Sequence, residues 1–261
     1  MQRWALGIEY LGEGFLGWQS QPGGRTVQDV LEAALGQIAG QPLRVSPVGR
    51  TDTGVHARLQ IVHFDAPQER PRTAWVRGVN AMLPRQVSVR WATPVPREFH
   101  ARAVATGRHY QYLLQDTPVR PGLNAGRVGW FHQPLDLAAM QTAASLLVGR
   151  HDFSAFRAAE CQAPTPVREL RRFEIGRLGE FLLFTLSADA FLHHMVRNLV
   201  GMMIFVGKGR HGPEWVATVL ASRDRRLAAP TFAPDGLYLV GADYDARWGL
   251  PEVSRPWTAP P

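Results

Sequence analysis

The segment GRTDTGVHA, from Gly49 to Ala57, is the part of this 261-residue chain from which the fold is most directly predicted. It holds one carboxylate, Asp52, among an arginine, two threonines, two glycines and a histidine. The flanking sequences LRVSPVG (43–49) and LQIVHFD (59–65) have the apolar character of β-strands, so the segment is predicted to be a tight loop between two strands. Three roles fit a lone acid in such a loop: a turn residue, half of a protease dyad, or a nucleophile.

The protease role disagrees with the rest of the sequence. Aspartic proteases need two aspartates that share one proton, and the chain has no second Asp-Thr-Gly or Asp-Ser-Gly. Arg50, two residues before the acid, would also hinder a shared proton. A phosphoaspartyl enzyme would need a second acid soon after the first, and none follows in this loop. A turn role, for which aspartate is well suited, and a nucleophilic role both stay open for Asp52.

Outward from this loop, the first half of the chain has the predicted order β-α-β-β-α-β. The first strand shows the alternation of large apolar and smaller residues that is typical of a half-buried strand. The first helix opens at Thr26, a residue type that caps helix N-termini. The predicted strands cover residues 3–10, 43–49, 59–65 and 86–92, and the predicted helices cover residues 26–38 and 73–82.

The second half has a similar predicted order. Strands are expected over 107–116 and 236–244, with a hairpin over 168–188 that turns near Leu178-Gly179. Helices are expected after a cap at Asp136, over 191–207, and from Pro213, a residue favoured in the first turn. The sequence therefore predicts an α+β protein made of two similar β-α-β-β-α-β halves. We expect the halves to be residues 1–100 and 101–246, followed by a loosely held tail over 247–261.

Composition points to a polyanionic partner. The net charge is +7 and the isoelectric point is about 10.4, and Lys208 is the only lysine, so arginine supplies nearly all of the positive charge. Arginine binds phosphate in a forked geometry and stacks on bases. GC-rich codon usage explains the choice of arginine equally well, but it does not require an excess of base over acid. Nucleic acid is the partner that this excess favours.

The sequence also predicts the cellular setting. The single cysteine, Cys161, excludes an internal disulfide and fits a reducing compartment. The longest apolar stretch, LVGMMIFVG (199–207), is far too short to span a bilayer. The N-terminal MQRWALGIEYLGEG lacks the apolar region of a signal peptide. We expect a cytoplasmic protein that makes no membrane contact.

Metal and nucleotide binding have little basis in the sequence. His193 and His194 are adjacent on a predicted helix and are expected to point in different directions. No His-Glu-x-x-His or paired-cysteine pattern occurs. The glycine-rich loop over 11–25 does not have the spacing of a triphosphate-binding loop, and Trp18 within it is expected to pack in the core rather than to stack on a base.

Several motifs together resemble one family. The segments GWQSQ, TVQDVLEAAL, GRTDTGVHA, NAMLP, FHARAVATGRHYQYLL, DFSAF and FLHHMVRNLVG occur in the order seen in bacterial tRNA pseudouridine synthase A enzymes. The resemblance runs from about Tyr10 to Tyr244. It implies the pseudouridine synthase fold, with an active-site cleft between the two halves. It also implies a homodimer that converts uridine to pseudouridine at positions 38, 39 and 40 of the tRNA anticodon stem-loop, with no cofactor and no metal.

The same resemblance assigns roles to residues. Asp52 resembles the family's catalytic aspartate, Tyr110 the tyrosine that stacks on the uracil, and Arg197 the basic partner of the aspartate. Two positions depart from the family pattern. Leu11 and its neighbours replace the usual Tyr-Asp-Gly-Thr, so that loop is not taken as a site, and Thr53 stands where alanine is common, a change that a loop should tolerate.

The chemistry explains this choice of residues. Moving uracil from its N1 to its C5 attachment conserves every atom, and it needs a carboxylate close to the anomeric carbon of the ribose. Asp52 either adds to C1′ or removes the C2′ proton to give a glycal, and the sequence leaves both routes open. A nearby arginine favours the ionised carboxylate. A target uridine has to be flipped out of its stack, and the arginines expected to hold flanking phosphates are Arg50, Arg58, Arg102 and Arg108.

A second function fits the same composition. A tRNA-binding protein without catalysis would keep the basic surface and would be free to lose the catalytic residues. Asp52, Tyr110 and Arg197 are all present, so the sequence favours the enzyme.

Overall fold

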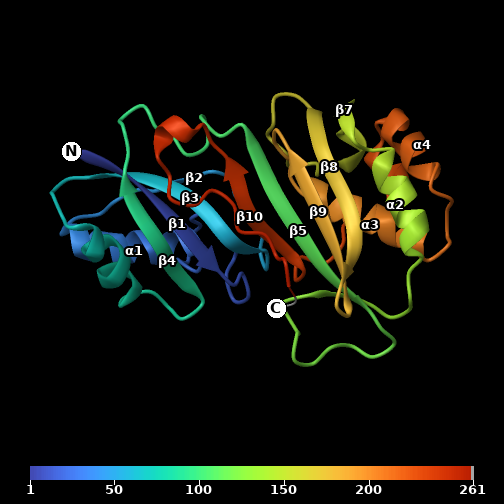
Figure 1. Ribbon diagram of the computed structural model, residues 1–261, viewed down its shortest axis with the longest axis horizontal. Helices are drawn as coiled ribbons and strands as arrows, with labels where there is room; N and C mark the ends of the chain where they lie inside the picture. Colours follow the sequence, from blue (N-terminus) through green and yellow to red (C-terminus); the bar gives the residue numbers. More distant parts are fainter. Residues whose placement is uncertain (260–261) are drawn as a thin grey trace. The chain divides into compact units, whose positions relative to one another are not determined.

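The computed structural model describes residues 1–259, which divide into two compact units (Figure 1). The first unit consists of Met1–Thr106 and Tyr238–Pro256, and the second of Gly107–Leu237 and the chain from Trp257 onward. Each unit combines strands with helices, which confirms the predicted α+β class. Nowhere in the described chain is there a helix with the length and apolarity needed to cross a membrane.

This division differs from the expected halves at both ends. The chain passes from one unit to the other after Thr106 rather than near residue 100, and the strand expected to close the second half belongs mostly to the first unit. That strand pairs in parallel with the first unit, where Tyr238 lies opposite His56. Sequence periodicity predicts a strand but carries no information about a partner so distant in the chain.

The first unit is built on a sheet with the strand order β4-β1-β3-β10. β1 pairs antiparallel with both β3 and β4, and the short β2 pairs antiparallel with β3. The bounds are β1 Gln2–Tyr10, β2 Ser46–Pro47, β3 His56–Ala66, β4 Val87–Pro94 and β10 Leu237–Asp243. The two expected strands on either side of the Asp52 loop are therefore present, although the first of them has only two residues.

Two helical segments were predicted for this unit, and both are found. α1 (Val27–Ala39) begins after Thr26, whose hydroxyl accepts a hydrogen bond from the backbone N–H of Asp29, as the N-cap prediction requires. The second segment is helical over residues 72–80, with a π-helical centre, η1, at Ala74–Gly78. The wider π turn places Trp75 in the core, where it is fully buried. No sequence signal distinguishes such a turn from an α-helix.

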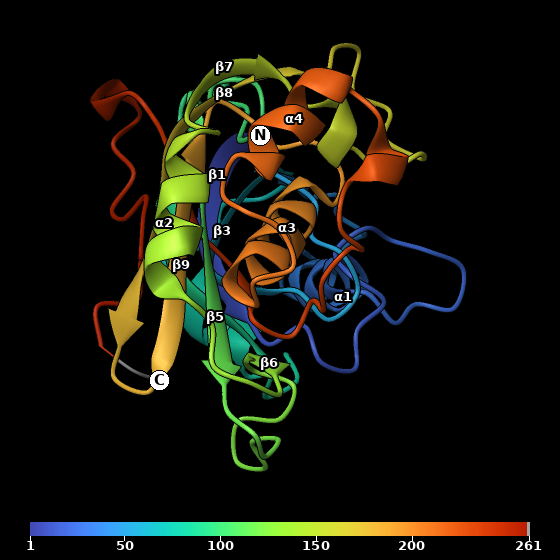
Figure 2. The same ribbon diagram turned by 90° about the vertical axis from the view of Figure 1, so that its right-hand side faces the viewer.

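Over its described residues, 247–259, the C-terminal stretch is not the loosely held tail that was expected, and residues 260–261 lie outside the described chain. It runs along the side of the first unit's sheet opposite α1 (Figure 2). Trp248 lies in a core cluster with Trp91 and Phe99, and Leu250 and Val253 pack against that cluster. The backbone is held too, since the N–H of Ala242 donates to the carbonyl of Val253 at 2.9 Å and the N–H of Arg255 donates to that of Val240 at 2.6 Å. The apolar side chains of Trp248, Leu250 and Val253 anchor the stretch to the first unit.

The second unit has a sheet with the strand order β5-β9-β8-β7, and β6 pairs in parallel with β5. β8 and β9 form the predicted hairpin, which turns at Gly179 with a φ of 61°, a left-handed value that favours glycine. The bounds are β5 Gly107–Asp116, β6 Gly129–Phe131, β7 Gly149–Asp152, β8 Val167–Leu178 and β9 Phe181–Ala188. The predicted strand over 107–116 is therefore confirmed.

Helices α2 and α3 of this unit pack against each other, and α2 also packs on β8 (Figure 2). The carboxylate of Asp136 accepts from the N–H of Ala139, which confirms it as the N-cap of α2. The helix bounds are α2 Leu137–Ser145, α3 Met195–Gly207 and α4 Trp215–Ser222, with short 3-10 turns at η2 Ser154–Phe156, η3 Arg225–Leu227 and, in the first unit, η4 Ala246–Trp248.

The start of α3 corrects two predictions. The helix begins at Met195 and not at residue 191, because His194 adopts a left-handed conformation with a φ of 61°. His193 and His194 therefore do not lie on the helix, and their ring centroids are only 4.0 Å apart. The prediction that the two rings point in different directions is wrong because it assumed helical geometry at both residues.

Candidate active site

Asp52 lies in the loop between β2 and β3, and its residue is half-buried. The backbone turns directly after it, since the N–H of Val55 donates to the carbonyl of Asp52 at 3.1 Å. Gly54 has a φ of 79° in this turn, a conformation that is costly for other residues. The turn that carries Asp52 therefore explains why the motif has a glycine at position 54.

The backbone of the Asp52 loop is held by hydrogen bonds on both sides. The side-chain amide of Gln60 donates to the carbonyl of Gly49 at 2.7 Å. The N–H of Trp18 donates to the carbonyl of Thr51 at 3.0 Å, and the hydroxyls of Thr51 and Tyr10 hydrogen-bond at 2.8 Å. Burial raises the pKa of Tyr10 to about 12, so this phenol stays neutral. The backbone that carries the Asp52 carboxylate is therefore held in position by the protein itself.

The glycine-rich loop over 11–25 supports the Asp52 loop, a role that the sequence did not reveal. Gly12 donates its N–H to Nδ1 of the fully buried His56 at 2.8 Å. A Cβ atom at Gly12 would lie 2.2 Å from the carbonyl oxygen of Val55, and one at Gly17 would lie 2.8 Å from that of Thr51. These two glycines allow the close approach that fixes the Asp52 loop. Trp18 is fully buried, so its predicted packing role is confirmed.

Arg50 and Arg102 are brought together at one hollow of about 290 Å³ in the first unit. Both residues are exposed. The hollow is lined by Gln19, Gln28, Val45, Ser46, Pro47, Gly49, Arg50, His100 and Arg102. Because Arg50 is two residues from Asp52, the hollow adjoins the loop that carries the candidate catalytic carboxylate.

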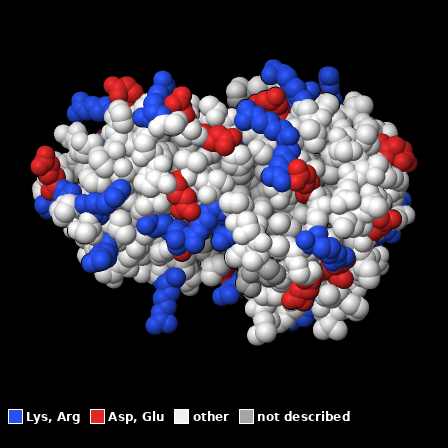
Figure 3. Space-filling view, viewed as in Figure 1, with Lys and Arg blue, Asp and Glu red and all other residues white. Residues whose placement is uncertain are grey.

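Arg58 belongs to a different group of charges on the first unit. Glu9 pairs with Arg90 at 3.0 Å and with Arg255 at 3.1 Å. Burial lowers the pKa of Arg58, and the nearby positive charge of Arg255 lowers it further. An arginine stays charged despite such a shift. Two arginines therefore pair with Glu9, and the charge of Glu9 also acts on Arg58. Figure 3 shows basic and acidic side chains intermixed over the face viewed, with one continuous group of basic side chains left of its centre.

The second unit carries Tyr110, Arg108 and Arg197. Tyr110 is half-buried on β5 opposite Leu186 of β9, and the ring of Phe191 meets its ring edge-on at 5.1 Å and 85°. Arg197 lies on α3, where its Nε donates to the carbonyl of Phe232 at 2.8 Å. This contact holds the Nε end of the guanidinium.

Arg108 makes a contact within the protein that gives it a structural role independent of RNA. Its Nη1 donates to the carbonyl of Asp189 at 2.9 Å, just beyond the end of β9. The guanidinium therefore ties β5 to the end of its neighbouring strand. A structural role fits Arg108 at least as well as the predicted phosphate contact.

Comparison with known proteins identifies the class to which this fold and these residues belong. A family model described as tRNA pseudouridine synthase matches residues 7–102 and 143–245. The chain belongs to this family. A protein of Dechloromonas aromatica (strain RCB) named tRNA pseudouridine synthase A is 61% identical over 250 residues, which cover 96% of this chain and 95% of that protein. A protein of the same name from Thiobacillus denitrificans (strain ATCC 25259 / T1) is 60% identical, with 98% and 99% covered.

Proposed function

We propose that this chain is an isomerase that converts uridine to pseudouridine in tRNA, at positions 38, 39 and 40 of the anticodon stem-loop. Family membership supports the reaction. The observation that carries the chemistry is the position of Asp52, a single carboxylate on a loop whose backbone is held by Trp18, Tyr10 and Gln60. A non-catalytic tRNA-binding protein would not need such a loop, and no comparison supports that alternative.

In the proposed reaction, Asp52 acts on the ribose of a flipped uridine. Its carboxylate either adds to C1′ as the C1′–N1 bond breaks, or removes the C2′ proton to give a glycal. The detached uracil turns and its C5 bonds to C1′ as the Asp52–C1′ bond breaks or, on the glycal route, as Asp52 returns the proton to C2′. The C5 proton then leaves while a proton is gained at N1, and Asp52 is again a free carboxylate. No atom is gained or lost overall, so the reaction needs no oxidant, reductant or triphosphate.

Two residues of the second unit complete the proposal. Tyr110 offers a flat ring for the uracil, and its phenol accepts the C5 proton in the last step. Arg197 is the cationic partner that keeps Asp52 ionised. Phosphates of the RNA are held by Arg50, Arg58 and Arg102, and RNA shape rather than base edges dominates recognition of the stem.

The assembly and location follow the family resemblance. We propose a cytoplasmic homodimer in which one tRNA touches both subunits. Light scattering of the purified protein is expected to give twice the 29.0 kDa chain mass at working concentrations. A mass of one chain under those conditions would contradict the dimer.

The first binding prediction concerns salt. With a net charge of +7 and several arginines on phosphates, tRNA affinity is expected to fall steeply as salt rises. A log–log slope of roughly −3 or steeper is expected, because each neutralised phosphate releases counterions. Filter binding of one tRNA transcript at several salt concentrations measures the slope, and a flat response would rule out the electrostatic proposal.

A second prediction concerns Arg197→Lys. Lysine keeps the positive charge but lacks the planar guanidinium. It therefore also lacks the Nε–H that donates to the carbonyl of Phe232. We expect turnover to fall more than tRNA affinity or the melting temperature. Single-turnover rates, binding and a thermal melt together measure the three effects. A variant that is mainly unfolded would show that Arg197 is chiefly structural.

The reaction itself is tested by incubating the purified protein with unmodified tRNA transcripts and mapping pseudouridine by chemical probing. Pseudouridine at positions 38, 39 or 40 is the expected product. Tight binding of the transcripts with no pseudouridine at any position would favour the non-catalytic protein instead.

A further inference from the structure

The hollow beside the Asp52 loop has the chemistry of an anion site. Among the nine described residues that line it, none is acidic, and Arg50, His100 and Arg102 bring polar donors to its wall. Two guanidinium groups in one hollow match the forked geometry that arginine uses for phosphate. The volume of about 290 Å³ is just below the range of about 300–1,000 Å³ for small-molecule pockets, so it suits one nucleotide unit rather than a helical stem.

His100 supplies a third donor. Its Nδ1 accepts the backbone N–H groups of Arg102 at 3.2 Å and Ala103 at 3.3 Å. Because Nδ1 is an acceptor, the neutral ring carries its proton on Nε2, which is then a donor. The same two hydrogen bonds fix the chain from His100 to Ala103, so the ring and the Arg102 backbone form one rigid wall.

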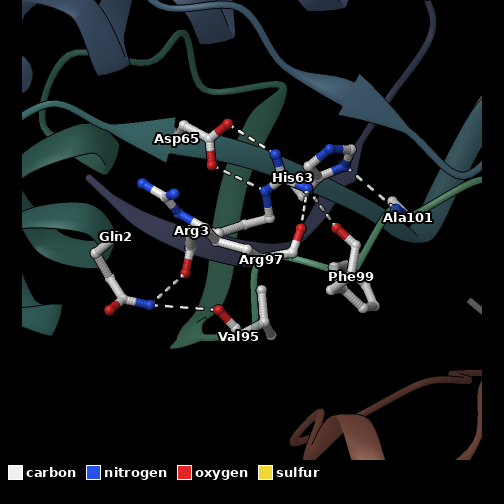
Figure 4. A network of polar contacts seen from close by, with 8 residues as sticks. All are labelled: Gln2, Arg3, His63, Asp65, Val95, Arg97, Phe99 and Ala101. Atoms are coloured by element: carbon white, nitrogen blue, oxygen red, sulfur yellow. Dashed lines mark hydrogen bonds and ion pairs between the residues drawn. The ribbon is translucent and has the colours of Figure 1, made fainter.

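That wall is attached to the core through a buried histidine. Nδ1 of His63, a residue that is only 5% exposed, accepts the N–H of Ala101 at 3.2 Å (Figure 4). His63 also donates to the backbone of Ser46, which lines the same hollow. Burial, helped by the neighbouring His100 and Arg3, lowers the pKa of His63 to about 4, so the His63 ring is neutral and both hydrogen bonds are kept at neutral pH.

A second anchor holds the chain just before the wall. Arg3 pairs with Asp65 at 2.8 Å and donates from Nη1 to the carbonyls of Arg97 at 2.6 Å and Phe99 at 2.9 Å (Figure 4). The segment that leads to His100 is therefore tied to Arg3 of β1, whose guanidinium is itself held by Asp65 of β3. An anion entering the hollow meets a His100 ring that is already in place, which lowers the entropy cost of binding.

We propose that this hollow binds one phosphodiester of the tRNA backbone close to the target uridine, through Arg50, Arg102 and Nε2–H of His100, and that His63 is the positioning residue for the wall. The proposal rests on tRNA being the substrate. It gives the hollow a task that is separate from the chemistry at Asp52, namely to hold the strand while the uridine is flipped.

The test pairs one protein change with one change in the RNA. Anticodon stem-loops are prepared that each carry one methylphosphonate, a linkage without charge, at successive positions around the target uridine. Wild-type protein is expected to lose about tenfold in affinity at one of these positions, as the loss of a charge-assisted hydrogen bond implies. Arg102→Gln is expected to lose a similar factor on unmodified RNA but to show no further loss at that position, because contacting groups are not additive.

Arg85→Gln is the matched control, since Arg85 is an exposed arginine of the same unit outside the hollow. It is expected to keep the whole methylphosphonate penalty. Additive losses for Arg102→Gln at every position would overturn the proposal. Wild-type pseudouridine formation is measured in parallel, so absence of product with the coupling intact would count against the proposed reaction and not against the hollow. Tight binding of free uridine 5′-monophosphate would reassign the hollow to a free nucleotide.

The positioning role of His63 has its own variants. His63→Leu removes both hydrogen bonds and is expected to raise KM about tenfold with kcat little changed, because the wall shifts while Asp52 does not. His63→Gln has an amide oxygen to accept from Ala101 and an amide N–H to donate to Ser46, and is expected to restore KM. If in both variants kcat fell by the same factor by which KM rose, the effect would be a general loss of structure, and His63 would be removed from the proposal.

Discussion

Replacing Asp52 by asparagine is expected to lower pseudouridine formation by several powers of ten while the fold and tRNA binding persist. Asparagine nearly matches the shape of aspartate but cannot act as an ionised nucleophile or base. The hydrogen bonds cited for the loop backbone do not involve the carboxylate. Its backbone carbonyls accept from the N–H groups of Trp18 and Val55 and from the side-chain amide of Gln60. Removal of a negative charge from the path of a polyanion should not weaken binding.

The experiment compares single-turnover rates on one tRNA transcript, with affinity and a thermal melt measured on the same samples. Thr53→Ala is the matched control, because Thr53 is the exposed neighbour of Asp52 in the same loop. That variant is expected to keep near wild-type turnover. If Asp52 only shaped the turn, asparagine, itself a good turn residue, would leave the rate close to wild type, and that result would refute the catalytic role.

Local signals in the sequence predicted the elements whose structure is decided locally. Thr26 and Asp136 cap α1 and α2 because their side chains reach N–H groups only three residues away. The hairpin at Gly179 follows from two apolar runs and a residue that tolerates a positive φ. These features need no knowledge of distant parts of the chain.

The features that the sequence did not predict depend on distant partners. The C-terminal stretch is ordered because Trp248 finds Trp91 and Phe99 more than a hundred residues earlier in the chain. The start of α3 is displaced because His194 adopts a left-handed conformation, which is uncommon for residues other than glycine. Neither composition nor periodicity carries information about these two effects.

Some residues of the candidate site could be selected from the sequence and others could not. Motif resemblance selected Asp52, Tyr110 and Arg197, and their joint action on one uridine stays a prediction. The supports of Asp52 could not be selected, because Gly12 and Gly17 act through the absence of a side chain. The buried polar residues His56, Gln60 and His63 look like ordinary strand residues until their hydrogen-bond partners are known.

Tyr110→Phe is expected to retain tRNA affinity within about twofold while turnover falls by roughly 10²- to 10⁴-fold, the usual contribution of a positioned proton acceptor. Phenylalanine keeps the ring, and with it the edge-on contact to Phe191 at 5.1 Å and the flat face offered to the uracil. Only the hydroxyl is removed. If that hydroxyl takes the C5 proton, the variant should still break the glycosidic bond but fail to complete the isomerisation.

The neighbouring strand residue Tyr112 provides the matched control. It is fully buried, and its hydroxyl donates to the carbonyl of Ala233 at 2.9 Å, so it has a structural role on the same strand. Tyr112→Phe leaves that carbonyl without its donor and is expected to lose about 1 kcal/mol of stability while turnover at low temperature is kept. The two variants thus remove the same atom from positions two residues apart on β5, with opposite expected effects. Full activity in Tyr110→Phe would leave its phenol without a chemical role and limit Tyr110 to stacking, because the ring is the only part that the variant keeps.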